Sequence, residues 1–417
     1  MAGPQVITLG CRLNAFESEI MRQHSRTAGL EDTVIINTCA VTAEAERQAR
    51  QTIRRARRDN PRAKLIVTGC AAQLSPEKFG NMPEVDRVFG NAEKLDPSSY
   101  SDWPESAAAI QVTDIMQVHE TAPHLVQGFE GRARAFVQVQ QGCDHRCTFC
   151  IIPFARGPNR SVGMGHLIEQ VRTLVDEGYK EVVLTGVDIC SYGEDLPGKP
   201  ALGCMVRKLL DSVPGLARLR LSSLDPAAMD DDLFQLLADE PRFMPHLHLS
   251  LQALDDMVLK RMKRRHDCAQ AAEVIGRARQ ARPDVVFGAD LIAGFPTETD
   301  EMFENTLRRV EELDLTHLHV FPYSAREGTA AARMPAVLGD VVKARAAHLR
   351  EAGLDAFARL RENQVGRTTT VLVENPGQGH NEHYVPVAFD AALAEPGQII
   401  NLKIEGVTPE GLKGSAA

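Results

Sequence analysis

The run Gln141-Gly-Cys143-Asp-His-Arg-Cys147-Thr-Phe-Cys150 places three cysteines close together, directly after a strand-like segment at 135–139. Soft thiolates at this spacing are ligands for zinc or for an iron–sulfur cluster. A closed site normally has four protein ligands, and the next cysteine along the chain is Cys190. Three ligands would leave one iron of a 4Fe–4S cluster open to bind a substrate or cofactor. The alternative is a zinc site completed by another residue, such as His145.

Three further cysteines, Cys11, Cys39 and Cys70, each close a short β-branched run that is typical of a buried parallel strand. Their separations of 28 and 31 residues are close to the length of one strand–helix repeat. In a doubly wound parallel sheet the carboxyl ends of the strands share one edge. We therefore expect these thiols to converge and to hold a second 4Fe–4S cluster. The alternative is three unrelated buried cysteines, which are common in proteins.

The pattern indicates an α/β protein in four segments. Residues 1–100 form the predicted N-terminal doubly wound domain, and residues 101–130, with prolines and serines, a linker with a strand near 108–112. Strand–helix alternation through 131–362 predicts a partial (βα)6 barrel whose site lies at the carboxyl ends of its strands, where Cys143 falls. Residues 363–417, with short strands and glycine-rich turns, predict a small β-barrel.

The expected elements follow from these patterns. Helices are expected in the N-terminal domain at 15–28 and 43–58. The strands of the central barrel are expected at 136–139, 182–186, 219–222, 246–251, 285–292 and 317–321. Its helices are expected at 167–177, 204–212, 231–239, 256–282, 302–313 and 341–362. Strands of the C-terminal segment are expected at 368–373, 384–389 and 399–407.

Composition narrows the class of protein. The 417 residues are 43% hydrophobic and 25% charged, which is ordinary for a globular protein. No secretion signal is visible, and no apolar run approaches the ~18 residues that span a membrane. We therefore expect a cytoplasmic protein, in which nine cysteines favour metal binding or catalysis over disulfides. The net charge of −9 argues against a general nucleic-acid coat but not against a local basic surface.

The motifs resemble those of the radical S-adenosylmethionine (SAM) methylthiotransferases over nearly the whole chain. The cysteine run itself, with Phe149 before its last cysteine, is similar to the radical SAM signature. Within the family the resemblance is to the threonylcarbamoyladenosine tRNA methylthiotransferases, and the C-terminal segment takes the place of their TRAM RNA-binding domain. The matching segments are 8–14, 37–42, 143–153, 184–188, 244–252, 287–298 and 319–324.

The resemblance implies a reaction and its cofactors. The family adds a methylthio group to C2 of a modified adenosine beside the anticodon of tRNA. In the family, a cluster like that expected at Cys143, Cys147 and Cys150 binds SAM and releases a 5′-deoxyadenosyl radical, so these cysteines are the predicted catalytic residues. A sulfur on the cluster at Cys11, Cys39 and Cys70 would accept a methyl group from another SAM. An electron donor of the reduced flavodoxin or ferredoxin type and a sulfur donor are implied partners.

Contacts to SAM and RNA are expected from residues at strand ends and in basic segments. For each polar residue the alternative is ordinary hydrogen bonding at a strand end, and for each basic run a solvated helix face. A departure from the family at 253–255, after Gln252, puts local SAM contacts in doubt. The expected SAM-binding residues are Phe149, Thr185, Gly186, Ser222, Ser250, Gln252 and Gly294. The expected RNA-binding residues are Arg156, Arg160, Arg264 and Arg265.

Other functions remain open from the sequence. The same chemistry could act on isopentenyladenosine in tRNA or on an aspartate of a ribosomal protein. An iron–sulfur electron carrier without catalysis is a different class, but it accounts neither for six strand–helix units nor for two sites with three ligands each. A purely RNA-binding protein with structural zinc would lack iron.

Overall fold

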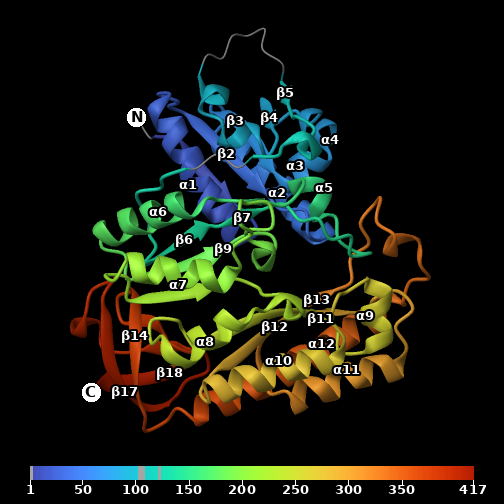
Figure 1. The fold of residues 1–417 in the computed structure, drawn as a ribbon. Helices are drawn as coiled ribbons and strands as arrows, with labels where there is room; N and C mark the ends of the chain where they lie inside the picture. Colours follow the sequence, from blue (N-terminus) through green and yellow to red (C-terminus); the bar gives the residue numbers. More distant parts are fainter. Residues whose placement is uncertain (1–2, 102–108, 121–123) are drawn as a thin grey trace.

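The computed structural model describes residues 3–101, 109–120 and 124–417. Parts of the predicted linker 101–130, including the start of its expected strand at 108, lie outside the described residues. Figure 1 shows an N-terminal sheet domain at the top, a central region of strands and helices below it, and a C-terminal barrel at the lower left. No helix in the described ranges is both long and apolar enough to cross a membrane.

The N-terminal domain is built on a parallel sheet whose five strands follow one another in chain order. Apolar side chains pack on both faces of the sheet: Ile35 and Ile66 meet Met21 on one face, while Val34 and Ile36 belong to a cluster on the other. The predicted parallel sheet is therefore confirmed, and apolar side chains cover both of its faces. Its strands are β1 (Gln5–Thr8), β2 (Thr33–Thr38), β3 (Lys64–Gly69), β4 (Arg87–Phe89) and β5 (Ile110–Gln111). Its helices are α1 (Arg12–Thr27), α2 (Ala43–Asp59), α3 (Cys70–Leu74) and α4 (Pro76–Gly80).

Six parallel strands form the central region, as the sequence predicts. They make two three-stranded sheets, which meet where Leu219 bridges to Phe243 and Leu224 to Leu249. The strands are β6 (Arg134–Gln138), β9 (Glu181–Thr185), β10 (Arg218–Leu221), β11 (His246–Gln252), β12 (Val286–Ala293) and β13 (Leu315–Pro322). The helices are α6 (Met164–Asp176), α7 (Leu202–Ser212), α8 (Asp231–Asp239), α9 (Asp256–Met262), α10 (Cys268–Ala281), α11 (Asp300–Glu312) and α12 (Gly339–Glu362). The short elements near the cysteine run are β7 (Gln140–Gln141), α5 (Ile152–Arg156) and β8 (Arg160–Ser161).

The single helix expected at 256–282 is wrong, because the chain breaks after α9. Lys263 takes a left-handed backbone conformation (φ 60°), which ends that helix. Asp267 then begins α10 through a capping box with Gln270. The break sends Arg264 toward the cysteine run, as described below, so it has a direct bearing on the site.

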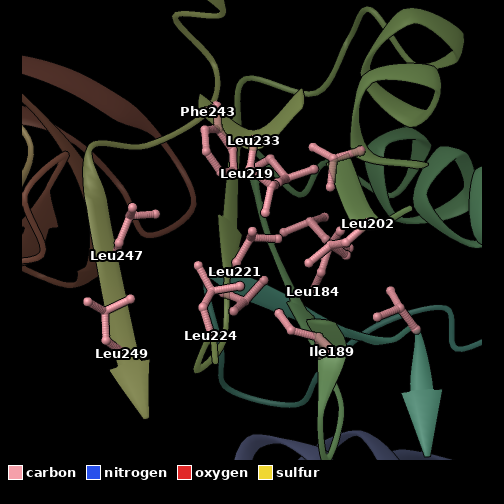
Figure 2. Close-up of a cluster of buried hydrophobic side chains, with 14 of the residues drawn as sticks. Leu184, Ile189, Leu202, Leu219, Leu221, Leu224, Leu233, Phe243, Leu247 and Leu249 are labelled. Atoms are coloured by element: carbon pink, nitrogen blue, oxygen red, sulfur yellow. The ribbon is translucent and has the colours of Figure 1, made fainter. Parts of the chain in front are cut away.

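Leucines fill the space between the strands and the outer helices. Figure 2 shows side chains of β9, β10 and β11, among them Leu184, Leu221 and Leu249, gathered in one cluster with Leu202 of α7 and Leu233 of α8. All five are at most 4% exposed. Because side chains alternate along a strand, the residues next to Leu184, Leu221 and Leu249 in their strands face the interior of the barrel.

That interior is polar at the amino ends of the strands. The carboxylate of Glu181 has no exposed surface and lies beside three arginines of neighbouring strands, with Nε of Arg134 and Nε of Arg220 both 3.0 Å away and Arg218 at 3.5 Å. Burial alone would raise the pKa of Glu181, but the three guanidinium groups lower it to about 2. The carboxylate therefore stays charged inside the protein and balances part of a positive cluster.

The C-terminal segment forms the predicted closed barrel, with five strands where three were expected. It docks on the amino end of the central barrel, where the hydroxyl of Tyr384 accepts a hydrogen bond from Arg134 (2.7 Å) and Arg220 lies over its ring. Arg12 of the N-terminal domain also approaches that ring, with Cζ 5.9 Å from its centre. The strands are β14 (Thr368–Asn375), β15 (Gln378–Asn381), β16 (Pro386–Ala388), β17 (Ile399–Val407) and β18 (Leu412–Ala416).

Candidate functional site

The loop that carries Cys143, Cys147 and Cys150 is held by hydrogen bonds to backbone groups at its start and in its middle. Gly142 has φ 74°, and a Cβ on it would lie 1.8 Å from a carbonyl oxygen, so only glycine fits before Cys143. The amide of Cys143 donates to the carbonyl of Gly157 (3.0 Å). In the middle of the loop, Thr148 bonds to backbone groups at the end of α9. The three thiols are therefore presented by a fixed segment.

These thiols lie close enough to influence one another. Burial raises the pKa of Cys143 to about 12 and that of Cys150 to about 11, and negative charge on Cys147 raises both. Without a metal the thiols of Cys143 and Cys150 would be protonated at neutral pH, so a metal must displace their protons as it binds. Nη1 of Arg264 lies 3.6 Å from Sγ of Cys147 and places a positive charge beside the site.

The carboxyl ends of the barrel strands surround this loop. Arg264 joins it to β11, because its Nη2 donates to the carbonyl of Ser250 (2.8 Å). Phe149 packs edge-on against Phe295, which follows β12 (6.5 Å between ring centres). The predicted location of the site at this end of the barrel therefore matches the structure.

Asp188, beyond the end of β9, approaches the loop through its carboxylate. It lies 2.9 Å from Nε2 of His145 and 4.0 Å from Sγ of Cys143. These three side chains form a possible metal-binding group, but it includes only one of the three cysteines of the run. His145, considered from the sequence as a fourth zinc ligand, is therefore turned toward a carboxylate.

The other expected SAM-binding residues lie at or near strand ends. Thr185 ends β9 and is 2% exposed; Ser222 follows β10 and is 9% exposed; Gln252 ends β11 in a left-handed conformation (φ 66°). A Cβ on Gly186 would lie 2.7 Å from the carbonyl oxygen of Gln140, and one on Gly294 would lie 2.5 Å from Val342. Protein contacts thus account for both glycines, and the expected SAM contacts stay predictions.

A hydrogen-bonded group on β11, β12 and β13 lies in the same interior and did not enter the predicted site. Oδ1 of Asp290 is 2.9 Å from Nε2 of His248 and 3.2 Å from Nδ1 of His319. Burial alone would raise the pKa of Asp290, but hydrogen bonds and charge from the two histidines lower it well below its usual range. His319 is the open end of the group, with 60% of its side chain exposed. Alternation along the strands places these residues together, but their spacing in the sequence does not reveal it.

The second site lies at the carboxyl edge of the N-terminal sheet. Cys11 is the N-cap residue of α1, Cys39 lies directly after β2, and Cys70 is the first residue of α3. The strands that precede these cysteines, β1, β2 and β3, are parallel neighbours in the sheet. A Cβ on Gly10 would lie 3.1 Å from Sγ of Cys39. Burial raises the pKa of Cys39 to about 11, and the charges of Cys70 and Cys11 add to the shift. The expectation that three strand-end thiols converge therefore agrees with the structure.

Arg156 lies against this second site instead of facing RNA. Its Nε donates to Sγ of Cys70 (3.1 Å), and its side chain is 2% exposed. It also pairs with Glu17, whose side chain has no exposed surface. The expectation that Arg156 contacts RNA is therefore corrected: the buried carboxylate and thiol hold the guanidinium inside the protein.

Of the other three arginines expected to contact RNA, two have buried side chains and one is exposed. Arg160 is 3% exposed and donates to backbone carbonyls, so it too is unable to reach RNA. Arg264 is 8% exposed in its side chain and lies at Cys147, which corrects its expected role. Arg265 is 37% exposed and 3.1 Å from Asp225, so it alone of the four faces solvent. Sequence reasoning identified these four arginines as candidates but did not reveal the protein groups that bind three of them inside the fold.

Both sites fit an iron–sulfur cluster. Each offers three thiols, and each has a guanidinium near a sulfur to match the negative charge of such a cluster. The donor set suits iron or zinc, the metals that thiolates prefer.

Comparison with known proteins decides between them. Residues 137–310 match the Radical SAM superfamily, and residues 4–90 match the Uncharacterized protein family UPF0004. A threonylcarbamoyladenosine tRNA methylthiotransferase MtaB of Rickettsia prowazekii is 52% identical over 97% of this chain and 95% of its own. The chain belongs to the radical SAM methylthiotransferase family. An MtaB of Bacillus subtilis is 36% identical over 95% of this chain and 92% of its own.

Two further comparisons concern a relative named for a different nucleoside and a solved structure. A tRNA-2-methylthio-N(6)-dimethylallyladenosine synthase of Maricaulis maris is 33% identical over 98% of this chain and 96% of its own. The structure of the radical SAM methyltransferase TsrM of Kitasatospora setae has a TM-score of 0.56 and 14% identity, over 80% of this chain and 77% of its own, which supports the fold alone. Membership confirms the transferase class and the expected cofactors, SAM and two 4Fe–4S clusters.

Proposed function

We propose that this methylthiotransferase adds a methylthio group to C2 of N6-threonylcarbamoyladenosine, next to the anticodon of tRNA. The observation that carries the choice of substrate is 52% identity over 97% of the chain with a relative named for that nucleoside. The two converging sets of three thiols support the chemistry, because the reaction needs a site that activates SAM and a site that delivers sulfur.

We assign the first cluster to Cys143, Cys147 and Cys150, with SAM over the carboxyl ends of β9 to β12. Phe149, Thr185, Gly186, Ser222, Ser250, Gln252 and Gly294 are the proposed contacts. The second cluster is assigned to Cys11, Cys39 and Cys70. When bound, these cofactors supply the one-electron chemistry and the sulfur, while the protein fixes where both arise. Asp290 and its two histidines lie inside the same barrel and would orient polar groups of the bound molecules.

The remaining partners follow from this assignment. We propose reduced flavodoxin or ferredoxin as electron donor, a separate sulfur donor, and action in the cytoplasm, where tRNA is modified. The proposed domains are residues 1–100 for the sulfur-delivering site, 101–130 as linker, 131–362 for the SAM site and 363–417 for RNA binding. The position of β5, Ile110–Gln111, in the N-terminal sheet supports extending the first domain past residue 100.

Three exposed side chains in or near the first cluster loop suit the RNA. Phe154 of α5 is 47% exposed, and Cζ of Arg146 lies 6.0 Å from the centre of its ring. An exposed aromatic ring paired with a guanidinium is a stacking surface for an unpaired base, and loops of unstacked bases are what proteins read in RNA. Arg265 is the solvent-facing arginine of the expected set. We propose these three side chains as contacts to the anticodon loop.

The test is mass spectrometry of nucleosides from tRNA incubated anaerobically with reconstituted protein, SAM, sulfide and a reductant. The tRNA pool contains both threonylcarbamoyladenosine and isopentenyladenosine. A methylthio increment on the first nucleoside alone is the expected result. SAM cleavage without an increment on either nucleoside would overturn the choice of tRNA and favour the ribosomal-protein aspartate.

The dimethylallyl (isopentenyl) nucleoside is the second candidate, because relatives named for it are 33% identical over nearly the whole chain. An increment on isopentenyladenosine alone would establish it. We rank it second because this identity is lower than the 52% shared with the MtaB of Rickettsia prowazekii, although the MtaB of Bacillus subtilis shares only 36%.

A further inference from the structure

Every donor of the Arg156 guanidinium has a partner. Besides the bond from Nε to Sγ of Cys70, Nη1 donates to Gln141 (2.7 Å) and to Glu17, and Nη2 donates to Asn14 (2.6 Å) and again to Glu17 (3.0 Å). A buried arginine with five satisfied donors is fixed in position, because any movement leaves a polar group unpaired. The bond to sulfur is therefore a fixed feature of the second site.

Arg156 shares its carboxylate partner with a second buried basic side chain. Glu17 also receives Nζ of Lys94 (2.6 Å), and both side chains have no exposed surface. Burial alone would raise the pKa of Glu17, but Arg156 and Lys94 lower it to about 2, so it is ionised. Burial lowers the pKa of Lys94, and the negative charge of Glu17 opposes that shift. Of the two basic groups that share this carboxylate, the Arg156 guanidinium is the one that touches a thiol of the second site.

A three-thiolate 4Fe–4S cluster carries net negative charge, and reduction adds to it. Potentials of such clusters depend on nearby charge, on hydrogen bonds to sulfur and on exposure. A guanidinium that donates to a ligand sulfur inside the protein stabilises the reduced form more than the oxidised form, because the electrostatic attraction is weakly screened there.

We propose that Arg156 is a positioning residue of the second cluster that raises its reduction potential through the charge and the hydrogen bond it holds at Cys70. The inference rests on the proposed function, since it takes Cys11, Cys39 and Cys70 as cluster ligands. Arg156 follows Cys150 by six residues, so the segment that completes the first site also tunes the second.

The experiment isolates the second cluster. Full-length protein with Cys143, Cys147 and Cys150 replaced by alanine is reconstituted anaerobically, its iron and sulfide are counted, and its potential is measured by a redox titration followed by electron paramagnetic resonance. In this background Arg156→Gln is expected to shift the potential downward. Glu17→Gln, which removes the anion, is expected to shift it upward. Arg57→Gln is the control, because Arg57 pairs with Asp86 at the opposite edge of the same sheet and should leave the potential unchanged.

Opposite shifts from the two variants are a result that a purely structural role would not give. Equal potentials in Arg156→Gln and its parent, or shifts of the same sign in both variants, would overturn the inference. Should Arg156→Gln not take up iron, the potential is measured in Arg156→Lys and Glu17→Gln instead. An upward shift of the potential in Glu17→Gln supports the inference, and an unchanged potential in that variant refutes it. Failure of the parent itself to bind a cluster would instead refute the assignment of Cys11, Cys39 and Cys70.

Discussion

Nε of Arg156 donates to Sγ of Cys70 across 3.1 Å, although the two residues belong to different domains. The helix that carries Arg156, α5, follows Cys150 and packs on α3, which begins at Cys70. The N-terminal domain is thus joined to the central barrel by the helix that follows the first cysteine loop. A reaction that needs SAM chemistry at one site and sulfur at the other benefits from this fixed placement.

Replacing Cys11, Cys39 and Cys70 with alanine should abolish methylthiolation and leave reductive cleavage of SAM, because the two sets of thiols are separate. Replacing Cys143, Cys147 and Cys150 should abolish both. The measurements are 5′-deoxyadenosine by chromatography and modified nucleoside by mass spectrometry. Cys204→Ala is the matched control, since Cys204 is exposed on α7 and should behave as the unaltered protein. Loss of cleavage in the first variant, with its fold intact by circular dichroism, would contradict the separation of roles.

Replacing Arg264 and replacing Arg265 should have different effects on SAM cleavage and tRNA binding, although the two residues are adjacent in the chain. Arg264→Ala removes the donor to Cys147 and to the Ser250 carbonyl, so SAM cleavage should fall by about 10–100-fold, as for other groups that support metal ligands. Arg265→Ala removes a solvent-facing cation and should weaken tRNA binding while leaving SAM cleavage unchanged. Cleavage assays and a filter-binding titration with tRNA separate the two. Equal effects of both changes on cleavage would count against the contact to Cys147.

Phe154→Ala should weaken tRNA binding by about 1–3 kcal/mol, the usual contribution of one base stacked on an aromatic ring. Phe154→Trp keeps a ring and should bind nearly as well as the unaltered protein. SAM cleavage without tRNA is the internal control and should be the same in both. An alanine variant that binds tRNA with undiminished affinity would remove Phe154 from the interface.

Gly69→Ala should destabilise the N-terminal domain and lower iron uptake at its site. Gly69 has φ 95°, and a Cβ on it would lie 2.3 Å from the carbonyl oxygen of Thr38, next to Cys39. Gly29→Ala is the control: Gly29 has φ 66° with nothing within 4 Å, so only the ~1 kcal/mol cost of a left-handed residue applies. Urea unfolding and iron analysis measure both effects. Equal losses in the two variants would show that the close contact is unimportant.

Glu181→Gln should cost about 3–5 kcal/mol of unfolding free energy, because it removes the buried carboxylate that Arg134, Arg218 and Arg220 share and leaves only Arg134 with a second carboxylate, Glu374. The same group predicts a pH dependence. The pKa of Glu181 is about 2 in the folded protein and ordinary in the unfolded chain, so its contribution is complete above about pH 4.5 and is lost as the pH falls toward 2. Urea unfolding between pH 7 and 3 should show this fall, and Glu181→Gln should reduce its slope. An identical slope in the variant would contradict the assignment.

Much of the architecture could be predicted because strands that are buried on both faces have distinctive runs of apolar residues. The runs before Cys11, Cys39 and Cys70 located three strands and the edge where they end. Short strands without such runs, such as β15 and β18, carry little signal and did not enter the predicted barrel.

The placement of charged residues could not be predicted in the same way. A basic run has the same composition whether it faces solvent or a buried carboxylate. The partners of Arg156, namely Glu17 and Cys70, lie 139 and 86 residues away in the chain, so no local pattern links them. The break at Lys263, which directs Arg264 to Cys147, differs from these contacts because it has a local signal: Asp267 and Gln270 form the capping box that begins α10.

Tyr384 is the point where all three parts of the protein meet: its ring lies within reach of Arg12 from the N-terminal domain and of Arg134 and Arg220 from the central barrel. The C-terminal barrel is therefore held by side chains from both other parts of the protein. A chimera with the barrel of a relative would lose these contacts wherever the relative has no tyrosine at this position. Engineering of substrate choice by exchange of domains should move the tyrosine and its three arginines together.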